Sequence, residues 1–575
     1  MGSSYRVCCC FTRSFWMAEL QPPDDVEELF EKYTGGSSAS YMTADQLRQF
    51  LASEQEATTD DSPEKIVENV LKQRHHIAKF TRNSLSLDDF FHYLFSVDLN
   101  PPFQSKVHQD MTAPLSHYFI FTGHNSYLTG NQLSSDSSDI PIITALKRGV
   151  RVIELDLWPN SSKDEIQVVH GRTLTTPVDL LKCLKSIRDY AFVSSDYPVI
   201  LTLEDHLTRK LQDKAKEMIT QTFEGMLYYP ESDNLKEFPS PEELKRRILI
   251  STKPPKEFLE AEELPKGKNT DHERPSQRLK FLLQNDSHED EQGQVDPIDD
   301  DCGDISPNLE PLTYKRLIAI HQRKKSKLED ALQIEPDKVC RVSFSEQKLE
   351  KVATSHGTDL VRFTQKNILR IYPKQTRFNS SNYSPFVGWM HGAQMVAFNM
   401  QGYGRSLWQM HGMFRGNGGC GYVKKPDFLM DEDHVFDPKA KLPVKTTLKV
   451  KVYMGDGWRM DFKKTHFDKY SPPDFYTKVG IAGVRADEIM HMTKVKDDQW
   501  IPVWDEEFSF PLTVPELALL QIQVHEHDND KKDDFGGQTC LPVSELKQGI
   551  RAIPLYSRRG EIFKSVKLLM CFKFV

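Results

Sequence analysis

Alternating apolar and polar positions divide the chain into stretches of different character. Between residues 115 and 253, short apolar runs alternate with stretches whose apolar positions recur at helical spacing. This repeated β/α pattern predicts a parallel sheet with helices between the strands. The five predicted strands of this region lie at 117–127, 150–158, 166–172, 198–206 and 247–253.

The β/α pattern stops after Lys253 and resumes further along the chain. Residues 254–312 are polar, and the stretch 285–304 contains no Lys or Arg, so we predict an acidic disordered linker. Strands resume at 340–346, 368–373 and 393–400. Five strands and three make the eight of a closed (β/α)8 TIM-like barrel, which the linker splits into halves at 111–253 and 313–430.

Residues 26–110, which precede the barrel, are predicted to form a helical lobe. Thr43 with Asp45, and Ser84 with Asp88, are candidate helix caps. The helix pairing resembles an EF-hand, but the loops lack the spaced carboxylates that bind calcium. We therefore predict a structural EF-hand-like lobe without calcium, with helices at 26–33, 43–55, 63–80 and 86–96.

Helical spacing disappears after Pro438, and the apolar positions then alternate with a period of two. This pattern predicts an antiparallel β-sandwich, which we assign to a separate domain at 431–575. Its predicted strands lie at 448–457, 475–482, 504–510, 518–528 and 564–574. The predicted fold is multidomain, with an α/β part and an all-β part.

Composition limits the class of protein. The net charge of -9 argues against a nucleic-acid partner, so we expect none. No apolar run is long enough to span a bilayer, so any membrane contact is expected to be peripheral. The nine cysteines are odd in number and mostly scattered, which indicates a reducing cytosolic compartment rather than a disulfide framework.

The N-terminal tail, residues 1–25, has neither the apolar core of a signal peptide nor a myristoylation pattern, because Arg6 stands where Ser or Thr is required. Cys8, Cys9 and Cys10 could be acylated and hold the tail to a membrane. We favour the alternative, a disordered tail with unmodified thiols.

Two carboxylates stand out in the predicted strand at 150–158. Glu154 and Asp156 are two residues apart and should point to one side, while Ile153, Leu155 and Leu157 point to the other. Two carboxylates on one face of an apolar strand repel each other unless a cation lies between them. That cation could be a bound metal or an Arg partner in a structural ion pair, and this strand alone leaves both open.

Polar residues follow nearly every predicted barrel strand, where catalytic residues of such barrels gather. Oxygen ligands suit calcium or magnesium rather than zinc, and the histidines titrate near neutrality. The cationic and hydroxyl side chains are suited to an anionic, phosphorylated substrate. Together they point to phosphodiester chemistry. The oxygen ligands are Asn125, Glu154, Asp156 and Glu204, the histidines are His124 and His170, and the rim residues are Lys253, Ser343 and Arg370, with Tyr372 beside them.

Several motifs resemble one family closely. TGHNSYLTGNQL, VIELDLW, VVHGRTLTT, VILTLEDH and RILISTK resemble the X region of eukaryotic phosphoinositide-specific phospholipase C, and SFSEQKLEK, ILRIYPKQTRFNSSNYSP, AQMVAFNMQG and NGGCGYVKKP resemble its Y region. The resemblance extends over residues 26–575 and implies that the last domain is a C2 domain. The arrangement, with no pleckstrin-homology domain before the helical lobe, is similar to the plant enzymes.

The resemblance implies a calcium-dependent hydrolysis of phosphatidylinositol 4,5-bisphosphate, and also of the 4-phosphate, to diacylglycerol and a soluble inositol phosphate through a cyclic phosphodiester. Calcium would be held by Asn125, Glu154, Asp156 and Glu204, with Glu154 or Glu204 as the base. His124 would stabilise the developing charge, and His170 would protonate the leaving oxygen and later activate water. Lys253, Ser343, Arg370 and Tyr372 match positions that contact the headgroup.

Two departures from the family pattern affect the substrate side. Ser251 stands where animal members carry a lysine, so one phosphate contact is weakened and the headgroup preference is in doubt. In the rim loops, Leu133 and Leu174 are apolar, but Arg172 and Thr376 stand where larger hydrophobic residues are common. Membrane contact is therefore expected to depend more on the last domain.

A second calcium site is predicted on neighbouring loops of the last domain, where clustered carboxylates could bridge calcium to lipid phosphate. It resembles the C2 calcium site, although Glu526 stands where Asp is usual and Ile501 is no ligand. The alternative is a solvated acidic loop. The candidate ligands are Asp468, Asp474, Glu526, Asp528 and Asp534.

Two rival functions follow from the same residues: a glycerophosphodiester phosphodiesterase, and a catalytically inactive lipid-binding scaffold. The Y-type motifs disfavour the first, and the second is disfavoured because no catalytic position is substituted. We expect the protein to be a monomer. We expect it in the cytoplasm and, as a peripheral protein, on the cytoplasmic face of the plasma membrane. The Gly-rich run at 416–421 matches a nucleotide-binding pattern but is interpreted as turns, because no helix follows it. We further hypothesise that the acidic linker shields the site, so that deleting residues 285–304 raises basal activity.

Overall fold

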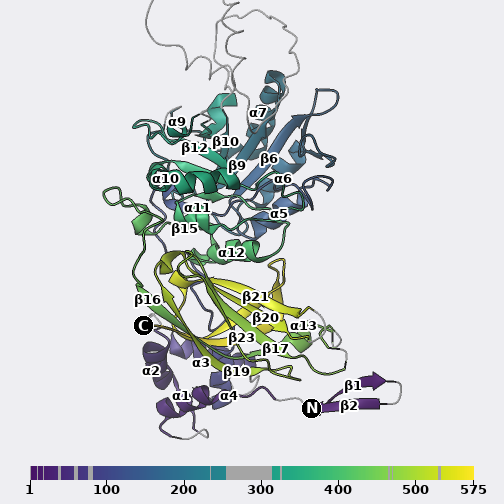
Figure 1. The fold of residues 1–575 in the computed structure, drawn as a ribbon, viewed down its shortest axis with the longest axis vertical. Helices are drawn as coiled ribbons and strands as arrows, with labels where there is room; N and C mark the ends of the chain where they lie inside the picture. The colour runs from purple at the N-terminus through teal and green to yellow at the C-terminus, as the bar shows by residue number, and fades with distance from the viewer. Residues whose placement is uncertain are drawn as a thin grey trace, which may run out of the picture.

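The computed structural model has three parts stacked along its long axis (Figure 1). The barrel lies at one end, the β-sandwich in the middle and the helical lobe at the other end. Among the described residues, no helix is long and apolar enough to cross a membrane. The structure describes residues 2–8, 11–16, 19–36, 40–56, 62–74, 82–232, 235–253, 314–323, 327–463, 466–468, 470–528 and 532–575. The predicted linker at 254–312 lies outside these residues.

The N-terminal segment is a β-hairpin, in which β1 (Gly2–Cys8) pairs antiparallel with β2 (Phe11–Trp16). The prediction of a disordered tail is therefore wrong for these residues. The ladder hydrogen bonds of two antiparallel strands give this short segment regular structure, which its composition did not indicate. Cys8 ends β1, whereas Cys9 and Cys10 lie outside the described residues.

The described residues of the helical lobe form the four predicted helices: α1 (Asp24–Thr34), α2 (Ala44–Glu54), α3 (Pro63–Arg74) and α4 (Leu87–Leu94). Two short strands, β3 (Met42–Thr43) and β4 (Ser84–Leu85), join its halves. The predicted caps were only partly right. Thr43 caps α2, but its reciprocal partner is Gln46 rather than Asp45, and α4 is capped by Ser86 with Asp89. In both helices the reciprocal residue is the third one after the cap, whose side chain reaches the cap backbone N–H.

Eight parallel strands close the barrel. The pairing passes from β5 through the successive strands to β14, and a parallel bridge between Gly123 and Phe398 closes the ring. Among the described residues, no regular ladder joins β5 to β6 or β11 to β12. Single parallel bridges connect these neighbours, from Thr122 to Val152 and from Gln322 to Arg341. The strands are β5 (Tyr118–Ile120), β6 (Val152–Pro159), β9 (Val199–Asp205), β10 (Ile248–Thr252), β11 (Ile318–His321), β12 (Arg341–Ser345), β13 (Ile368–Tyr372) and β14 (Met395–Val396).

The predicted total of eight strands was correct, but one member was wrong. β7 (Ile166–Val168) was expected among the parallel strands, whereas it pairs antiparallel with β6 and with β8 (Val178–Asp179). The eighth barrel strand is β11, which was not predicted because it is four residues long and precedes a basic run. Since β10 and β11 are neighbours, the two barrel halves meet where the predicted linker leaves and rejoins the barrel.

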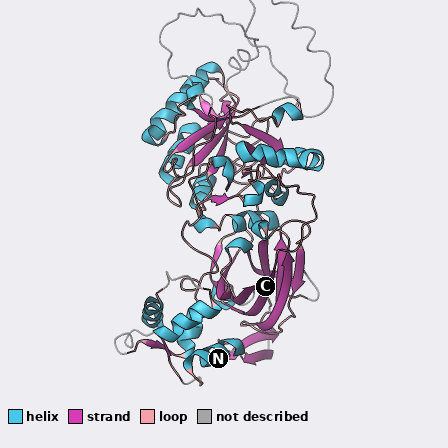
Figure 2. Ribbon diagram, turned by 90° about the vertical axis from the view of Figure 1, so that its left-hand side faces the viewer, coloured by secondary structure: helices cyan, strands magenta, loops and turns pink. Residues whose placement is uncertain are grey.

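Helices surround the barrel (Figure 2). Ile153, Leu155 and Leu157 point outward into the core beneath them, as the strand pattern predicted. The inward side chains at the amino ends of the strands, among them Val152 and Ile200, form a separate apolar cluster. The helices are α5 (Ile140–Lys147), α6 (Leu180–Tyr190), α7 (Arg209–Phe223), α9 (Leu328–Ala331), α10 (Glu346–Lys366), α11 (Phe386–Met390) and α12 (Arg405–Met413).

The Gly-rich run does form turns. Asn417, Gly418, Gly419 and Gly421 all have positive φ, and the run leads into β15 (Tyr422–Lys424), which pairs antiparallel with β5. In the described stretch 422–463, the run is followed by β15 and not by a nucleotide-binding helix, in agreement with the prediction.

The last domain is antiparallel throughout, as predicted. Its strand order is β18-β17-β20-β21-β22-β23-β16-β19, and a single pair between Gln538 and Tyr556 links β21 to β22. The two halves of this order contribute side chains to one core. The strands are β16 (Thr446–Asp456), β17 (Phe475–Ala482), β18 (Ile489–Met492), β19 (Val503–Leu512), β20 (Leu519–Glu526), β21 (Asp534–Pro542), β22 (Gly549–Tyr556) and β23 (Ile562–Phe574), with the short helix α13 (Trp458–Asp461) after β16.

The β-sandwich contacts both other parts. On the lobe side, Arg551 donates to the Asn100 side chain at 2.7 Å and to the Gln55 carbonyl at 2.6 Å. On the barrel side, Arg405 at the start of α12 donates to Gln521 at 2.9 Å, and Arg415 donates to the Cys540 carbonyl at 2.9 Å. The sandwich is thus the structural link between the lobe and the barrel.

Candidate active site

The barrel interior changes from apolar to polar along its axis. Two residues after the apolar cluster, the inward positions carry a buried layer that we call the polar layer: Glu154, Thr202, Ser251, Arg341 and Arg370. Because side chains alternate along a strand, this layer points inward as its apolar predecessors do. The next inward positions lead to the carboxyl ends of the strands, where barrel active sites form.

Glu154 has an Arg partner. Its carboxylate forms an ion pair with Arg370, and both side chains are buried. The second carboxylate oxygen, Oε2, accepts from the Asn125 backbone N–H at 3.1 Å. Burial raises the pKa of Glu154, but the charges of Arg370 and His124 and the Asn125 N–H together outweigh it, so the pKa is lowered. The Arg alternative that the sequence left open is therefore present for this carboxylate.

Asp156 forms no ion pair with an Arg of the described residues. Its Oδ2 accepts from the Tyr127 hydroxyl at 2.8 Å, but its buried Oδ1 has no hydrogen-bond partner among the described residues. Burial, and then the charges of Glu204 and Glu154, raise the pKa of Asp156 well above its usual value. Glu204 lies opposite Asp156 in the register of β6 and β9, and it is exposed. Three carboxylates therefore meet at this end of the barrel with an oxygen that lacks a partner.

His124 and Asn125 follow β5 in a tight turn. Asn125 has a φ of 41°, in the left-handed region that Asn adopts more readily than most residues. Its side-chain amide donates to Gln132 at 2.9 Å, which leaves its oxygen available. The Nδ1 atom of His124 lies 3.0 Å from the Asn399 side-chain oxygen. Burial lowers the pKa of His124, so the neutral ring is favoured.

His170 reaches the same end of the barrel from a different element. It lies after β7, in the hairpin that leaves β6, and its Nδ1 is 2.7 Å from the Gln132 carbonyl. The Gln132 amide also donates to Ser380 at 2.8 Å and to Asn399 at 3.1 Å. One glutamine thus holds groups from both barrel halves around the two histidines.

The predicted headgroup residues are spread over β10, β12 and β13, with β11 between the first two. Lys253 is exposed directly after β10, and the buried hydroxyl of Ser343 has no hydrogen-bond partner among the described residues. Ser343 is paired in register with Arg370, whose guanidinium lies 5.6 Å from the centre of the Tyr372 ring. Ser251 is buried and donates to the Ile320 carbonyl at 3.2 Å, so it presents no charge to the mouth of the barrel.

Sequence reasoning missed four residues of the site. Tyr127 and Gln132 lie in the loop after β5, Asn399 follows β14, and Arg341 is inside the barrel, where it donates to Thr202 at 3.1 Å and to Gln322 at 2.6 Å. Burial lowers the pKa of Arg341 to about 9. Asn399 could have been found as a polar residue after a barrel strand. Nothing local identifies Arg341, because its role depends on the strands beside it.

The rim loops bring two apolar residues together. The Leu174 backbone N–H donates to the Leu133 carbonyl at 2.8 Å, and the two side chains are 84% and 44% exposed. Leu133 directly follows Gln132, so these exposed side chains lie beside the histidine end of the barrel. Exposed apolar side chains around a site often mark an interaction surface.

The carboxylates of the last domain also converge. Among the described residues, Asp468, Glu526 and Asp528 are the one set of three potential metal ligands whose oxygens all lie within 4.8 Å of one another. Burial, and then Asp468, Asp528, Asp534 and Asp474, raise the pKa of Glu526 to about 8. Both Glu526 oxygens lack a hydrogen-bond partner among these residues. The four predicted Asp ligands therefore all lie near enough to Glu526 to raise its pKa, so the five predicted ligands gather at one site.

Both carboxylate groups fit a hard cation. Oxygen donors that are buried and unpartnered, with raised pKa values, carry a cost that a bound divalent cation removes. In the barrel the donors stand beside two histidines and the cationic residues Lys253 and Arg370. This arrangement can bind a phosphate ester, supply or accept protons and hold a divalent cation.

Family models match four stretches of the chain. Residues 17–101 match the EF-hand-like model of phosphoinositide-specific phospholipase C, and residues 446–557 match the C2 domain. Residues 111–254 and 314–428 match the X and Y domains of phosphatidylinositol-specific phospholipase C.

Whole-chain relatives agree with these matches. Phosphoinositide phospholipase C 6 of Arabidopsis thaliana is 58% identical over 99% of this chain and 97% of its own length. Phosphoinositide phospholipase C 4 of the same plant is 59% identical over 100% and 99%. The mouse 1-phosphatidylinositol 4,5-bisphosphate phosphodiesterase delta-3 is 32% identical over 95% of this chain and 67% of its own length. The crystal structure of S. officinalis PLC21 has the same fold, with a TM-score of 0.72 and 23% identity over 96% of this chain and 68% of that one.

Proposed function

Because this chain belongs to the phosphoinositide-specific phospholipase C family, we propose that the polar end of its barrel is the catalytic centre. The chain is a phosphoinositide phospholipase C, a phosphoric diester hydrolase. In the proposed reaction, the inositol 2-hydroxyl attacks the 1-phosphate and diacylglycerol leaves. Water then opens the resulting cyclic phosphodiester to a soluble inositol phosphate.

The observation that carries the proposal is the free oxygen of Asp156. This oxygen is buried near the charges of Glu154 and Glu204. Burial and those charges raise the pKa of the Asp156 carboxyl group. A carboxyl group in this state destabilises the fold, so its presence points to a functional role. Such perturbed groups gather at functional sites. Calcium would be held here by Asn125, Glu154, Asp156 and Glu204. When bound, calcium supplies positive charge that lowers the pKa of the attacking hydroxyl.

Glu204 is the better candidate for the general base. Glu154 has both oxygens engaged, by Arg370 and by the Asn125 N–H, and its pKa is lowered. A base with a low pKa and no free oxygen takes up a proton poorly. Glu204 is exposed at the end of β9, where a substrate hydroxyl can approach it.

The two histidines have separate roles in this proposal. His124 is half-buried, and its Nδ1–H is held by the Asn399 side-chain oxygen. The anionic substrate favours the protonated ring, whose other N–H donates to the charge that develops on the phosphate. His170 is half-buried on the β7 hairpin, with its Nδ1 held by the Gln132 carbonyl. Its other nitrogen faces away from that carbonyl and protonates the diacylglycerol oxygen, then activates water.

Headgroup recognition is assigned to Lys253, Ser343, Arg370 and Tyr372. An exposed ammonium group and a hydroxyl without a partner suit the ring phosphates. Ser251 makes its hydrogen bond within the barrel wall, so the second ammonium group of animal members has no replacement at this position. We infer that the enzyme accepts both the 4-phosphate and the 4,5-bisphosphate. Its preference for the 4,5-bisphosphate should be smaller than that of a site with lysines at both position 251 and position 253.

The enzyme is proposed to reach its lipid peripherally, at the cytoplasmic face of the plasma membrane. Leu133 and Leu174 supply an exposed apolar contact beside the active site. The carboxylates around Glu526 would hold calcium between the C2 domain and lipid phosphate. Their mutual repulsion without a cation supports this second site.

The test measures water-soluble inositol phosphate released from vesicles that contain either the 4-phosphate or the 4,5-bisphosphate, with free calcium buffered from nanomolar to millimolar. His124→Ala should abolish release, whereas Ser134→Ala, an exposed change in the same loop, should not. Calcium-dependent vesicle binding without release at any calcium level would identify a lipid-binding scaffold and refute the proposal.

A further inference from the structure

Arg341 is a cation buried inside the barrel. The residue is 1% exposed, and burying a charge costs free energy that an ion pair or a bound ion must offset. Among the described residues, its guanidinium donates to two neutral groups, the Thr202 hydroxyl at 3.1 Å and the Gln322 side-chain oxygen at 2.6 Å, and it forms no ion pair. Its Nε atom is buried without a hydrogen-bond partner among the same residues. The immediate neighbours of Arg341 therefore leave its charge uncompensated.

The polar layer as a whole has an excess of positive charge. It contains two arginines and one carboxylate, and that carboxylate, Glu154, is paired with Arg370. Burial and then the Arg370 charge lower the pKa of Arg341 to about 9, against the attraction of Glu154 and Glu204, so the guanidinium stays charged near neutral pH. Asp156 and Glu204, at the next inward positions, are assigned to calcium, whose charge offsets theirs. With calcium bound, Arg341 has no carboxylate left to neutralise it.

Arg341 lies beneath the proposed headgroup residues. Side chains two residues apart on a strand share a face, so Ser343 is the next inward position on β12, roughly 7 Å further along the strand. On the other side of the guanidinium, Thr202 is paired in register with Ser251, and Lys253 follows Ser251 by two residues. The charge of Arg341 thus lies below both sides of the proposed phosphate site.

We propose that Arg341 is a specificity-determining residue, whose buried positive charge favours the more highly phosphorylated of two inositol headgroups. This inference rests on the proposed function of the barrel site. A further phosphate monoester brings about −1.5 to −2 charge near pH 7. A cation in the barrel interior attracts that charge over a longer distance than a cation in water, and salt screens it less.

The test compares kcat/KM for the 4,5-bisphosphate with kcat/KM for the 4-phosphate, each lipid in phosphatidylcholine vesicles at saturating calcium. We call the quotient of the two values the headgroup ratio. Arg341→Gln removes the charge and should lower the headgroup ratio by about fivefold, whereas Arg341→Lys keeps the charge and should change it by less than about twofold. Damage to packing alone slows both substrates alike, so the ratio separates the effect of the charge from a structural effect.

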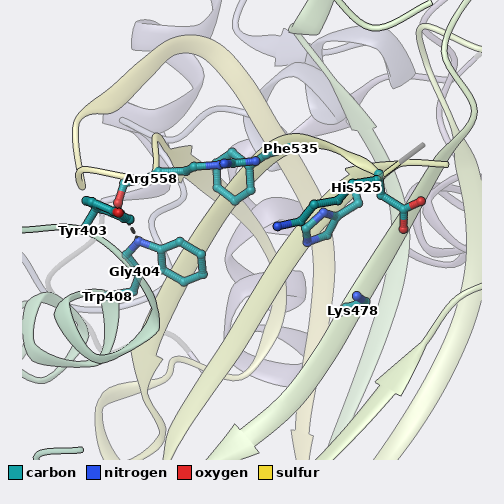
Figure 3. A pocket seen from close by; sticks show the side chains of 9 residues that line it. Tyr403, Gly404, Trp408, Lys478, His525, Phe535 and Arg558 are labelled. Carbon is teal, nitrogen blue, oxygen red and sulfur yellow. Dashed lines mark hydrogen bonds between the residues drawn. The ribbon is translucent and has the colours of Figure 1, made fainter. Parts of the chain in front are cut away.

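Arg558→Gln is the matched control. Arg558 is exposed and lines a pocket with Trp408 of α12, where its guanidinium lies 5.0 Å from the centre of the Phe535 ring (Figure 3). Its removal takes one cation from the surface of the C2 domain and none from the barrel interior. Both lipids should therefore be affected alike, and the headgroup ratio should change by less than about twofold.

A second measurement tests Arg341 without hydrolysis. Calorimetry gives the affinities of the full-length protein for inositol 1,4,5-trisphosphate and inositol 1,4-bisphosphate, and Arg341→Gln should reduce the difference between them. A wild type that binds these headgroups but hydrolyses neither lipid would refute the proposed function and leave this inference standing.

Thermal unfolding establishes that each variant is folded, and Arg341→Met is the second neutral variant. A folded neutral variant that keeps both the wild-type headgroup ratio and the wild-type difference in affinity overturns the proposal. A ratio that Arg341→Lys loses as fully as Arg341→Gln also overturns it, because the shape of the side chain rather than its charge would then set the preference.

Discussion

Buried carboxylates without partners mark both proposed calcium sites at the level of single residues. Asp156 in the barrel and Glu526 in the C2 domain each have a buried oxygen with no hydrogen bond among the described residues, and each has a raised pKa. Burying such a group costs free energy that the fold must recover elsewhere. Removing the charge should therefore stabilise the protein while it impairs calcium binding.

Asp156→Asn tests in the barrel whether removing the charge raises stability and impairs calcium binding. The amide has nearly the same shape but removes a charge that Glu204 and Glu154 repel. In chelator the variant should unfold at the same temperature as the wild type or higher, whereas hydrolysis at saturating calcium should fall by about 100-fold or more. Thermal unfolding and inositol phosphate release measure the two effects. Asp164→Asn, in the exposed turn between β6 and β7, is the control, and full activity of Asp156→Asn would contradict the proposed site.

Glu526 predicts a pH dependence. Its pKa rises from 4.5 unfolded to about 8 folded, so the folded state holds a proton that the unfolded state releases between these values. Without calcium, the stability that this proton supplies is present below the unfolded pKa and is lost as pH rises through the folded pKa. The unfolding temperature in chelator should fall across this window, and Glu526→Gln should flatten the fall, unlike Glu488→Gln at an exposed position.

Calcium should reverse the same trend. Because calcium and the proton compete for Glu526, the rise in unfolding temperature on adding calcium should be larger near pH 8 than near pH 6. A calcium effect that is equal at both values, or one that Glu526→Gln leaves unchanged, would show that this carboxylate is not a ligand.

At the scale of elements, the sequence predicted strands better than their partners. The alternation of β6 places Glu154 and Asp156 inward, because the period of a strand is a local property. The direction of β7 is not local: its apolar residues fit a parallel strand equally well, and only pairing with β6 shows the hairpin. β11 is too short for a periodic signal, and its place is set by β10 and β12.

The same contrast between local sequence pattern and long-range contact applies to the residues of the candidate site. Residues at strand ends, such as His124 and Glu204, could be found from position alone, since the barrel brings these ends together. The Glu154–Arg370 ion pair joins strands 216 residues apart in sequence, so no local pattern specifies it. Gln132 was missed because its importance lies in the four groups that its side chain and carbonyl contact.

The loop after β5 supports a prediction at this scale. Gln132→Leu removes the side-chain bonds to Asn125, Ser380 and Asn399, and should lower kcat by about ten- to a hundredfold because Asn125 and, through Asn399, His124 lose positioning. Buried groups left without partners should cost about 1–3 kcal/mol of stability. Steady-state kinetics and thermal unfolding measure both, with Ser134→Ala in the same loop as the control. An unchanged kcat would show that the loop is only structural.

At the scale of the whole molecule, the C2 domain is the centre of the assembly. The lobe core includes the C2 residues Tyr453, Ile550 and Leu569, so the lobe buries its apolar face against this domain. The barrel contacts other C2 strands, β20 and β21, through α12. Since the two contacts use different strands, weakening one should leave the other intact.

Arg551 provides the test of that independence. It is buried between the lobe and the C2 domain, and Arg551→Ala would leave the Asn100 side chain and the Gln55 carbonyl without this donor, at a cost of about 3 kcal/mol. Hydrogen exchange should therefore increase in α2, whose C-cap is Gln55, and in α4, while β6 and β9 in the barrel stay protected. Arg551→Lys should restore part of the protection, because an ammonium group can reach one acceptor but not both. If exchange rises equally in the barrel, the three parts unfold as one unit, and the C2 domain transmits damage at one contact to the other.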